Sequence, residues 1–215
     1  MPASNPVDLR TGLAEQRRAP QRAARAFSEA VRRGDLPAIA GAVSALDMLC
    51  AWREGFMAVR RVTSVPSKVR ERFLAIWVNH GDSIRSAVAD DLVLIDGLRV
   101  LLPPYEGPAM TLYRGEGAWN RRRRTYGLSW SADRGVGESF AQGLWQTCEG
   151  GSVLLESAAP AGAIICSPAM LGTDRDEAEY LVDRRRLARV AVLQRYAQLS
   201  IDEARRRSVH GSTGA

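Results

Sequence analysis

The chain has 215 residues, of which 46% are hydrophobic and 25% charged, and its 30 basic and 24 acidic side chains give a net charge of +6. This balance is typical of a globular protein and excludes a largely disordered or collagen-like chain. The sequence pI near 9.8 is compatible with an anionic partner. A charge of +6 over this length is too small to indicate nucleic-acid binding by itself.

The cysteines and histidines predict neither disulfides nor a metal site. Cys50, Cys148 and Cys166 are odd in number and far apart, which argues against a disulfide framework. With only His80 and His210 beside them, the sequence has no zinc-ligand spacing. We therefore expect no bound metal and a reducing, cytoplasmic setting, either in the protein's own cell or in a target cell.

No part of the sequence predicts insertion into a membrane. The longest apolar candidate, residues 36–52, is short and contains Pro37 and Asp47. The first residues lack a basic segment followed by an apolar one, so we expect no secretory signal. We further expect a monomer.

The first half of the chain is dominated by helical patterns. Residues 1–20 contain three prolines and little periodic hydrophobicity, which predicts a flexible arm. Apolar residues at helical spacing predict four helices, over residues 22–33, 39–50, 67–79 and 84–101. We expect a break at 80–82, and Pro103 and Pro104 must end the last helix.

After Pro108 the pattern changes to short apolar runs bounded by Gly, Pro and Asp, as is typical of strands. These runs predict strands over residues 110–114, 152–156, 163–166, 178–182 and 188–193. Between the first two, Val136, Phe140 and Leu144 recur at helical spacing, with Ser131 as a candidate N-cap.

Helices followed by short strands predict an α+β fold. We expect a single domain over residues 21–204, in which a helical lobe (21–105) packs on a strand-rich region (106–204). Residues 205–215 are polar and predict a flexible tail.

Two carboxylates stand where the strand over 178–182 begins. Because side chains alternate along a strand, Glu177 and Glu179 project from one face, about 7 Å apart, while Tyr180 and Val182 can pack inward. One acid of such a pair can stabilise positive charge on a sugar carbon while the other orients a nucleophile. A solvated strand end is the simpler interpretation of this pair taken alone.

Two other groups of polar residues are candidates for the same site. Ser129 and Ser131 share a face, with Trp130 turned to the core, and their hydroxyls could fix the rotamer of a carboxylate. Ser131 could instead simply cap the following helix. Arg114 ends a predicted strand and offers a planar fork of donors suited to a diphosphate, or simply to a surface ion pair.

In their order along the chain, these motifs resemble the R-S-E class of ADP-ribosyltransferases, which includes many bacterial toxin-like and arginine-modifying enzymes. The residues that carry the resemblance are Tyr113-Arg114-Gly115, Ser129-Trp130-Ser131 through Phe140-Ala141, and Glu177-Ala178-Glu179. It covers about residues 110–193, and Trp130 stands where the family commonly has Thr. The resemblance implies a split β-sandwich that binds NAD as co-substrate, without a metal.

The resemblance also implies roles for these residues. Glu179 would bind the ribose 2′-hydroxyl and stabilise the positive charge that develops as nicotinamide leaves, and Ser129 would hydrogen-bond this acid. Glu177 would position or deprotonate the acceptor, which residues 167–176 would present. The residues expected to contact NAD are Arg114, Tyr113, Gly115, Ser131 and Phe140.

The expected function is NAD-dependent mono-ADP-ribosylation, with release of nicotinamide and transfer to arginine of a protein acceptor, since Glu177 matches the family pattern for arginine. Transfer to nucleic acid and hydrolysis of NAD remain alternatives. So does a non-catalytic basic module on the same fold that binds nucleic acid or a protein. The basic run Arg121–Arg124, beside Trp119 and Tyr126, predicts either a phosphate-binding loop, for the NAD diphosphate or a nucleic acid, or a solvated loop.

Overall fold

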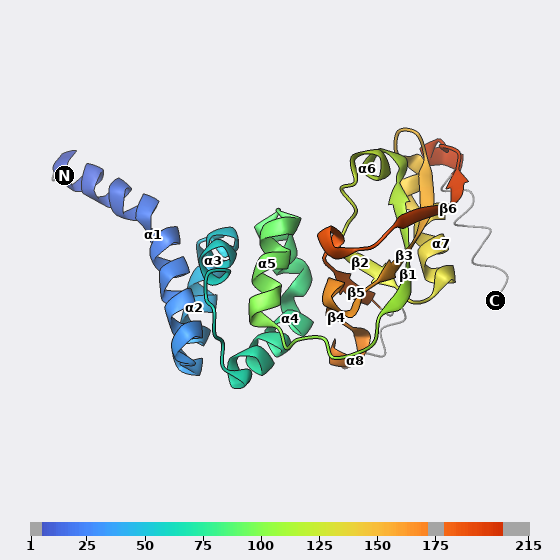
Figure 1. Cartoon of the computed structure of the whole chain (residues 1–215). Helices are drawn as coiled ribbons and strands as arrows, with labels where there is room; N and C mark the ends of the chain where they lie inside the picture. The colour runs from blue at the N-terminus through green and yellow to red at the C-terminus, as the bar shows by residue number, and fades with distance from the viewer. Residues whose placement is uncertain (1–5, 172–178, 204–215) are drawn as a thin grey trace. The chain divides into compact units, whose positions relative to one another are not determined.

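The computed structural model describes residues 6–171 and 179–203, apart from the side chains of residues 6–14, 144 and 171. The chain divides into two compact units, Met1–Pro103 and Pro104–Ala215 (Figure 1). The change from helices to strands lies where the sequence predicted it. Each unit has its own set of internal contacts, and the expected single domain over 21–204 stays a prediction.

The first unit is helical within its described part. Its helices are α1 (Pro6–Arg33), α2 (Leu36–Met48), α3 (Trp52–Val59), α4 (Ser67–Val88) and α5 (Asp91–Leu101). The flexible arm expected over residues 1–20 is wrong from Pro6 onward, because α1 begins there and continues through Pro20. A proline inside a helix removes one hydrogen bond and can bend the helix without ending it, and Figure 1 shows α1 changing direction along its length.

An aromatic cluster forms the centre of the helical unit. The rings of Phe27, Trp52, Phe56 and Phe73 lie with neighbouring centroids 6.0–6.4 Å apart, in tilted and edge-to-face arrangements that aromatic pairs favour. Helix α3, which supplies Trp52 and Phe56, was not predicted from the sequence. Its eight residues are too few to reveal a helical period.

The break expected at residues 80–82 is also wrong, since α4 continues to Val88. A methyl group at Gly81 would lie 3.1 Å from the Trp77 indole, so this glycine makes room for a buried ring and does not interrupt the helix. The real boundary is set by Asp90, whose side chain caps α5 by accepting hydrogen bonds from its first backbone N–H groups.

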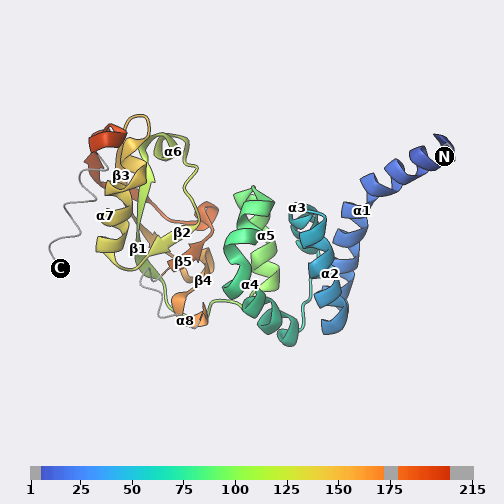
Figure 2. The same cartoon turned by 180° about the vertical axis from the view of Figure 1, so that it is seen from behind.

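The second unit contains one antiparallel sheet with strand order β4-β5-β2-β1-β3-β6, which confirms the α+β class (Figure 2). Its strands are β1 (Met110–Gly117), β2 (Ser129–Ser131), β3 (Ser152–Ala159), β4 (Ile164–Cys166), β5 (Glu179–Val182) and β6 (Val190–Tyr196). The helices are α6 (Ala118–Arg123), α7 (Arg134–Gln142) and α8 (Pro168–Leu171), with 3-10 turns η1 (Leu144–Thr147), η2 (Ala161–Ala163) and η3 (Arg184–Arg186). In the described part of the chain, no helix has the length and apolar character needed to cross a membrane.

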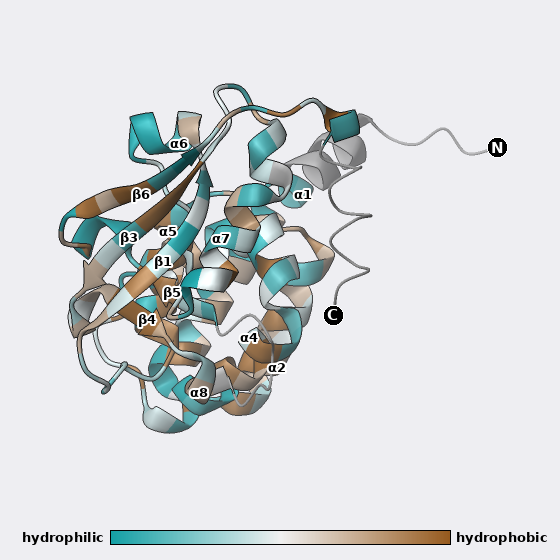
Figure 3. Cartoon of the chain, turned by 90° about the vertical axis from the view of Figure 1, so that its right-hand side faces the viewer, coloured by the Kyte–Doolittle hydropathy of each residue, from teal (hydrophilic) through white to brown (hydrophobic). Residues whose placement is uncertain are grey.

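The sheet consists of two halves with a narrow junction. Strands β1 and β2 pair only through Tyr113 and Ser131, whereas β1 pairs with β3 along its whole length. The halves β4-β5-β2 and β1-β3-β6 share one buried apolar cluster, and hydrophobic residues run along β3 and β6 (Figure 3). The members of this cluster are Leu112, Tyr126, Trp130, Val153, Leu155, Ala159, Ala163, Ile164 and Val182.

Helix α7 covers the sheet on the face opposite this cluster. Its N-cap is Asp133, whose side chain accepts from the N–H of Gly135, so the prediction of Ser131 as the cap is wrong. The buried side of α7 is formed by Gly137 and Ala141 and not by Phe140, which is 48% exposed. Two of its small residues face β1, which allows the helix backbone to approach the strand closely.

We expect Gly115→Ala to destabilise the protein, because α7 lies directly on this residue. The added methyl group would lie 2.6 Å from the carbonyl oxygen of Gly137 and would also overlap the backbone nitrogen of Ala141. Overpacking against backbone costs about 1–3 kcal/mol, and urea denaturation measures the loss. The control is Gly41→Ala in α2, where a methyl group meets nothing within 4 Å and is expected to raise stability by up to about 1 kcal/mol. Equal stability of the two variants would contradict the close contact.

Candidate active site

Three predicted site residues form a row across adjacent strands. Tyr113 of β1 lies opposite Ser131 of β2, and Ser131 lies opposite Glu179 of β5. Directly opposed residues of antiparallel strands project from the same face, with Cβ atoms about 5 Å apart. The row therefore brings a phenol, a hydroxyl and a carboxylate together on the face that α7 covers over β1.

The hydroxyl directly across from Glu179 belongs to Ser131. The residue that the resemblance assigned to this role, Ser129, lies opposite Leu181 and is thus a diagonal neighbour of Glu179 on the same face. Ser131 is buried, and its Oγ accepts a hydrogen bond from the N–H of Asp133, 3.0 Å away. This bond fixes the Ser131 side chain at the point where β2 leads into α7.

Arg114 leaves β1 on the opposite face. Strand alternation separates it from Tyr113, and a methyl group at Gly137 of α7 would lie 3.0 Å from the Tyr113 Cβ, which places the Tyr113 side chain on the helix side. Arg114 reaches β2 by donating from Nη1 to the carbonyl oxygen of Ser129, 2.5 Å away. Arg114 thus contacts the backbone of Ser129, and the side chains of the two residues lie on opposite faces of the sheet.

The partner of Arg114 is a carboxylate that the sequence analysis missed. Glu116 is fully buried, and its Oε2 accepts from Nε of Arg114 at 2.8 Å. Its oxygens also accept from the N–H groups of Gly117 and Gly127 and from the Asn120 amide, each at 3.0 Å. One carboxylate therefore joins β1, α6 and the segment before β2.

These contacts explain the ionisation of Glu116. Burial alone would raise its pKa, but the positive charge of Arg114 and hydrogen bonds from Asn120, Arg114 and Gly127 together hold the pKa below its ordinary value of 4.5. Glu116 is therefore a buried anion paired with a cation that is itself only 12% exposed. The strand alternation that places Arg114 and Glu116 on one face could have revealed this pair in the sequence Arg114-Gly115-Glu116.

The remaining predicted residues occupy different positions. Gly115 is buried under α7, so its predicted contact with NAD stays a prediction. The backbone of Phe140 lies over Gly115, and its side chain is about half exposed. Glu177, like residues 172–176 of the predicted acceptor loop, lies outside the described residues.

A buried thiol lies close to Glu179. Cys166 of β4 is paired with Leu181 of β5 and is fully buried. Burial, and to a smaller extent the nearby charge of Glu179, raises the pKa of Cys166 to about 12, whereas its contact with the Ser167 backbone lowers it. The thiol near Glu179 is therefore neutral at physiological pH.

The side chains of the row can form hydrogen bonds with the hydroxyl groups of a sugar. Among the described residues, no three His, Cys, Asp or Glu side chains form a group that could hold a metal ion. The row offers a carboxylate and hydroxyls for a ribose, and Phe140 offers an exposed aromatic face for a flat ring. No family model, curated protein or solved structure is significantly similar to this chain, so this chemical fit rests on the residues themselves.

Proposed function

We propose that the protein is a mono-ADP-ribosyltransferase that cleaves NAD at the Glu179 face of its sheet. The observation that carries the proposal is the row Tyr113–Ser131–Glu179 across three adjacent strands. The sequence motifs that resemble the R-S-E class are separated by up to 66 positions, from residue 113 to residue 179. Tyr113, Ser131 and Glu179, one residue from each motif, nevertheless lie side by side in the sheet, which supports a shared site.

The narrow junction of the sheet is a second support for the proposal. A split β-sandwich requires the sheet to separate into two parts, and β1 and β2 are joined by a single residue pair. The Glu179 row crosses the sheet at this pair. The proposal therefore places the dinucleotide at this junction.

The chemistry proposed for the site is electrostatic. NAD supplies an ADP-ribosyl group when the bond between ribose C1′ and the nicotinamide nitrogen breaks and the electron pair leaves with nicotinamide. The Glu179 carboxylate faces the ribose, binds its 2′-hydroxyl and stabilises the positive charge that develops at the sugar carbon. In this proposal Ser131 and Ser129, which lie on the same strand face as Glu179, hydrogen-bond the carboxylate and hold it in place.

Arg114 acts in this proposal as a positioning residue. Its guanidinium carries five donors, and the contacts to Glu116 and to the Ser129 carbonyl use two of them. It fixes β2, and with β2 the serines that share a strand face with Glu179, next to β1. Contact with the NAD phosphates, as the resemblance implies, would have to use the remaining donors.

The acceptor in the proposal is an arginine side chain of a protein. Glu177 would take the proton that the attacking guanidinium nitrogen loses as it bonds to the ribose carbon. This assignment rests on the resemblance alone, and water as the acceptor would give NAD hydrolysis at the same carboxylate.

The test is release of nicotinamide from NAD by the purified chain. We expect nicotinamide to form well above the rate without protein, and label from the adenylate part of NAD to appear on protein in a cell lysate and to survive RNase. Label removed by RNase would assign the transfer to RNA and overturn the protein acceptor. No nicotinamide release, with lysate, with agmatine as a small guanidine or with water alone, would overturn the proposed reaction.

A further inference from the structure

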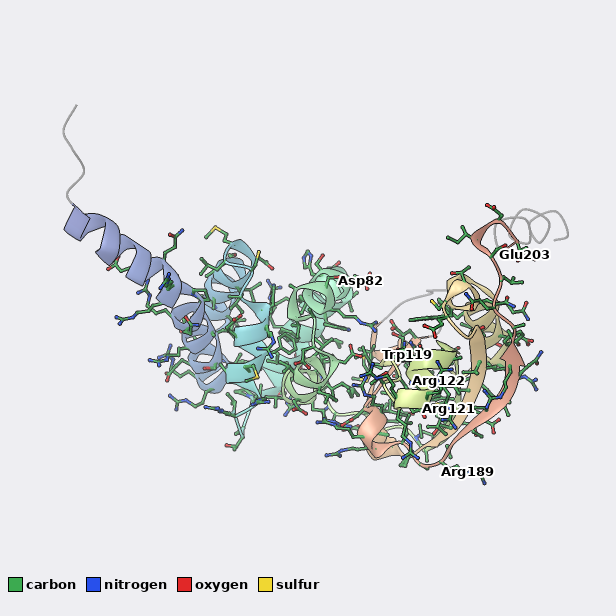
Figure 4. All side chains as sticks on the ribbon, turned by 90° about the horizontal axis from the view of Figure 1, so that it is seen from above. Asp82, Trp119, Arg121, Arg122, Arg189 and Glu203 are labelled. Carbon is green, nitrogen blue, oxygen red and sulfur yellow. The ribbon has the colours of Figure 1, made fainter. Side chains whose placement is uncertain are left out.

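The short helix α6 carries an exposed aromatic side chain among positive charges. Trp119 is 47% exposed, although the guanidinium carbons of Arg122 and Arg123 each lie 5.3 Å from the centre of its ring. This distance is within the range of cation–π attraction. The ring and the two arginines therefore form one unit with both apolar and positive surface, and Figure 4 shows Trp119, Arg121 and Arg122 together at α6.

A second arginine run lies next to the first. Nη1 of Arg184, in η3, donates to the carbonyl oxygen of Tyr126, 2.7 Å away and two residues after Arg124. The runs Arg121–Arg124 and Arg184–Arg186 are 60 positions apart in the sequence, and this hydrogen bond brings the second run close to the segment that follows the first. The buried Asp183 pairs with Arg185 and Arg186, at 2.9 and 3.7 Å. This one acid stands against the seven arginines of the two runs, so positive charge remains in excess.

This surface is held rigidly by the interior of the unit. Asn120 of α6 donates to the buried carboxylate of Glu116, and the N–H of Ala118 donates to the carbonyl of Gly151, 2.9 Å away. The last turn closes when Arg124 adopts a left-handed conformation with φ 55°. A ligand would thus meet side chains whose backbone is already in place, which reduces the entropy lost on binding.

We propose that Trp119, Arg121–Arg124 and Arg184–Arg186 form a binding surface for single-stranded nucleic acid, here called the α6 surface. Arginine forks bind phosphate oxygens, and a half-exposed indole provides a platform on which a base stacks without regard to its identity. A duplex keeps its bases stacked on each other and offers Trp119 nothing to stack on, so single strands are preferred. This binding does not depend on NAD chemistry.

The test is binding of a fluorescently labelled twelve-nucleotide oligo(dT) by the full chain, followed by anisotropy at several salt concentrations without NAD. We expect Arg122→Glu/Arg123→Glu to weaken binding at least tenfold at low salt and to reduce the steepness of the salt dependence by about 1–1.5 in log–log slope. Trp119→Ala is expected to weaken binding about tenfold and to leave that slope unchanged, because stacking releases no counterions.

Two controls complete the experiment. Arg60→Glu/Arg72→Glu makes the same change of charge at exposed positions of the helical unit and is expected to bind within twofold of the wild type. Trp119→Phe keeps an aromatic face and is expected to recover most of the affinity, which excludes a loss of folding as the cause. Equal binding by all variants, or equal affinity for a duplex of the same length, would overturn the proposal. Because no NAD is present, neither result bears on the proposed transferase activity.

Discussion

Glu179→Gln is expected to abolish cleavage of NAD. The change removes the negative charge opposite the developing positive carbon and keeps the size and hydrogen-bonding shape of the side chain. Loss of one preorganised electrostatic group lowers kcat by about 10²–10³-fold in other enzymes. Because the charge matters most in the transition state, we expect kcat to fall much more than KM changes.

The measurement is nicotinamide release at several NAD concentrations, with transfer to protein measured in parallel. The control is Glu149→Gln, the same chemical change at an exposed position after η1, which is expected to retain full activity. Both readouts must fall together in the Glu179 variant, because bond cleavage precedes transfer to any acceptor. A Glu179→Gln protein with wild-type nicotinamide release would remove Glu179 from the reaction and with it the proposed site.

The row of Glu179 could be predicted in part from the sequence. Alternation along a strand correctly placed Tyr180 and Val182 against the core and Glu179 on the other face. It could not give the register between strands, which decided that Ser131 and not Ser129 lies opposite Glu179. Register depends on which backbone pairs form over the whole sheet, and a three-residue strand such as β2 carries too little pattern to specify it.

The predicted helix boundaries in the first unit were wrong for a related reason. Whether a helix continues past a residue such as Gly81 depends on its tertiary contacts, here the packing of the Trp77 ring against it. Pro20 predicted an irregular arm and lies instead inside a 28-residue helix. Periodicity located the apolar faces, while the boundaries were set by caps such as Asp90 and by packing that single-sequence patterns do not contain.

The structure changes the interpretation of Arg114 more than that of the other predicted site residues. As an isolated arginine at a strand end, it was interpreted as a ligand for the NAD phosphates. Its alternation with Tyr113 and its contact with Glu116 show that it lies on the other face of β1 and is bound to a buried acid. When a carboxylate lies two positions from an arginine on the same face of a strand, as Glu116 does, the sequence indicates an internal ion pair as an alternative to a ligand contact.

Glu116→Gln is expected to destabilise the protein by about 3–5 kcal/mol, because removing one partner leaves the Arg114 charge buried without compensation. The double variant Arg114→Leu/Glu116→Leu removes both charges, and we expect it to lose much less than the sum of the two single leucine changes. Urea denaturation of the wild type, the three leucine variants and Glu116→Gln measures these differences. Additive losses would mean that the two side chains do not interact, contrary to the 2.8 Å contact.

The pH dependence of the same comparison is independent of how well each variant packs. The pKa of Glu116 is lower in the folded protein than its ordinary value of 4.5, so its ionisation stabilises the fold fully at pH values above 4.5. That contribution is lost as the pH falls through the lower, folded pKa. The stability difference between wild type and Glu116→Gln is therefore expected to be constant near neutral pH and to shrink below pH 4.5. A difference that stayed constant into acid would mean that Glu116 is not held as a buried anion, and Arg114 would then lack the partner that fixes β1 to β2.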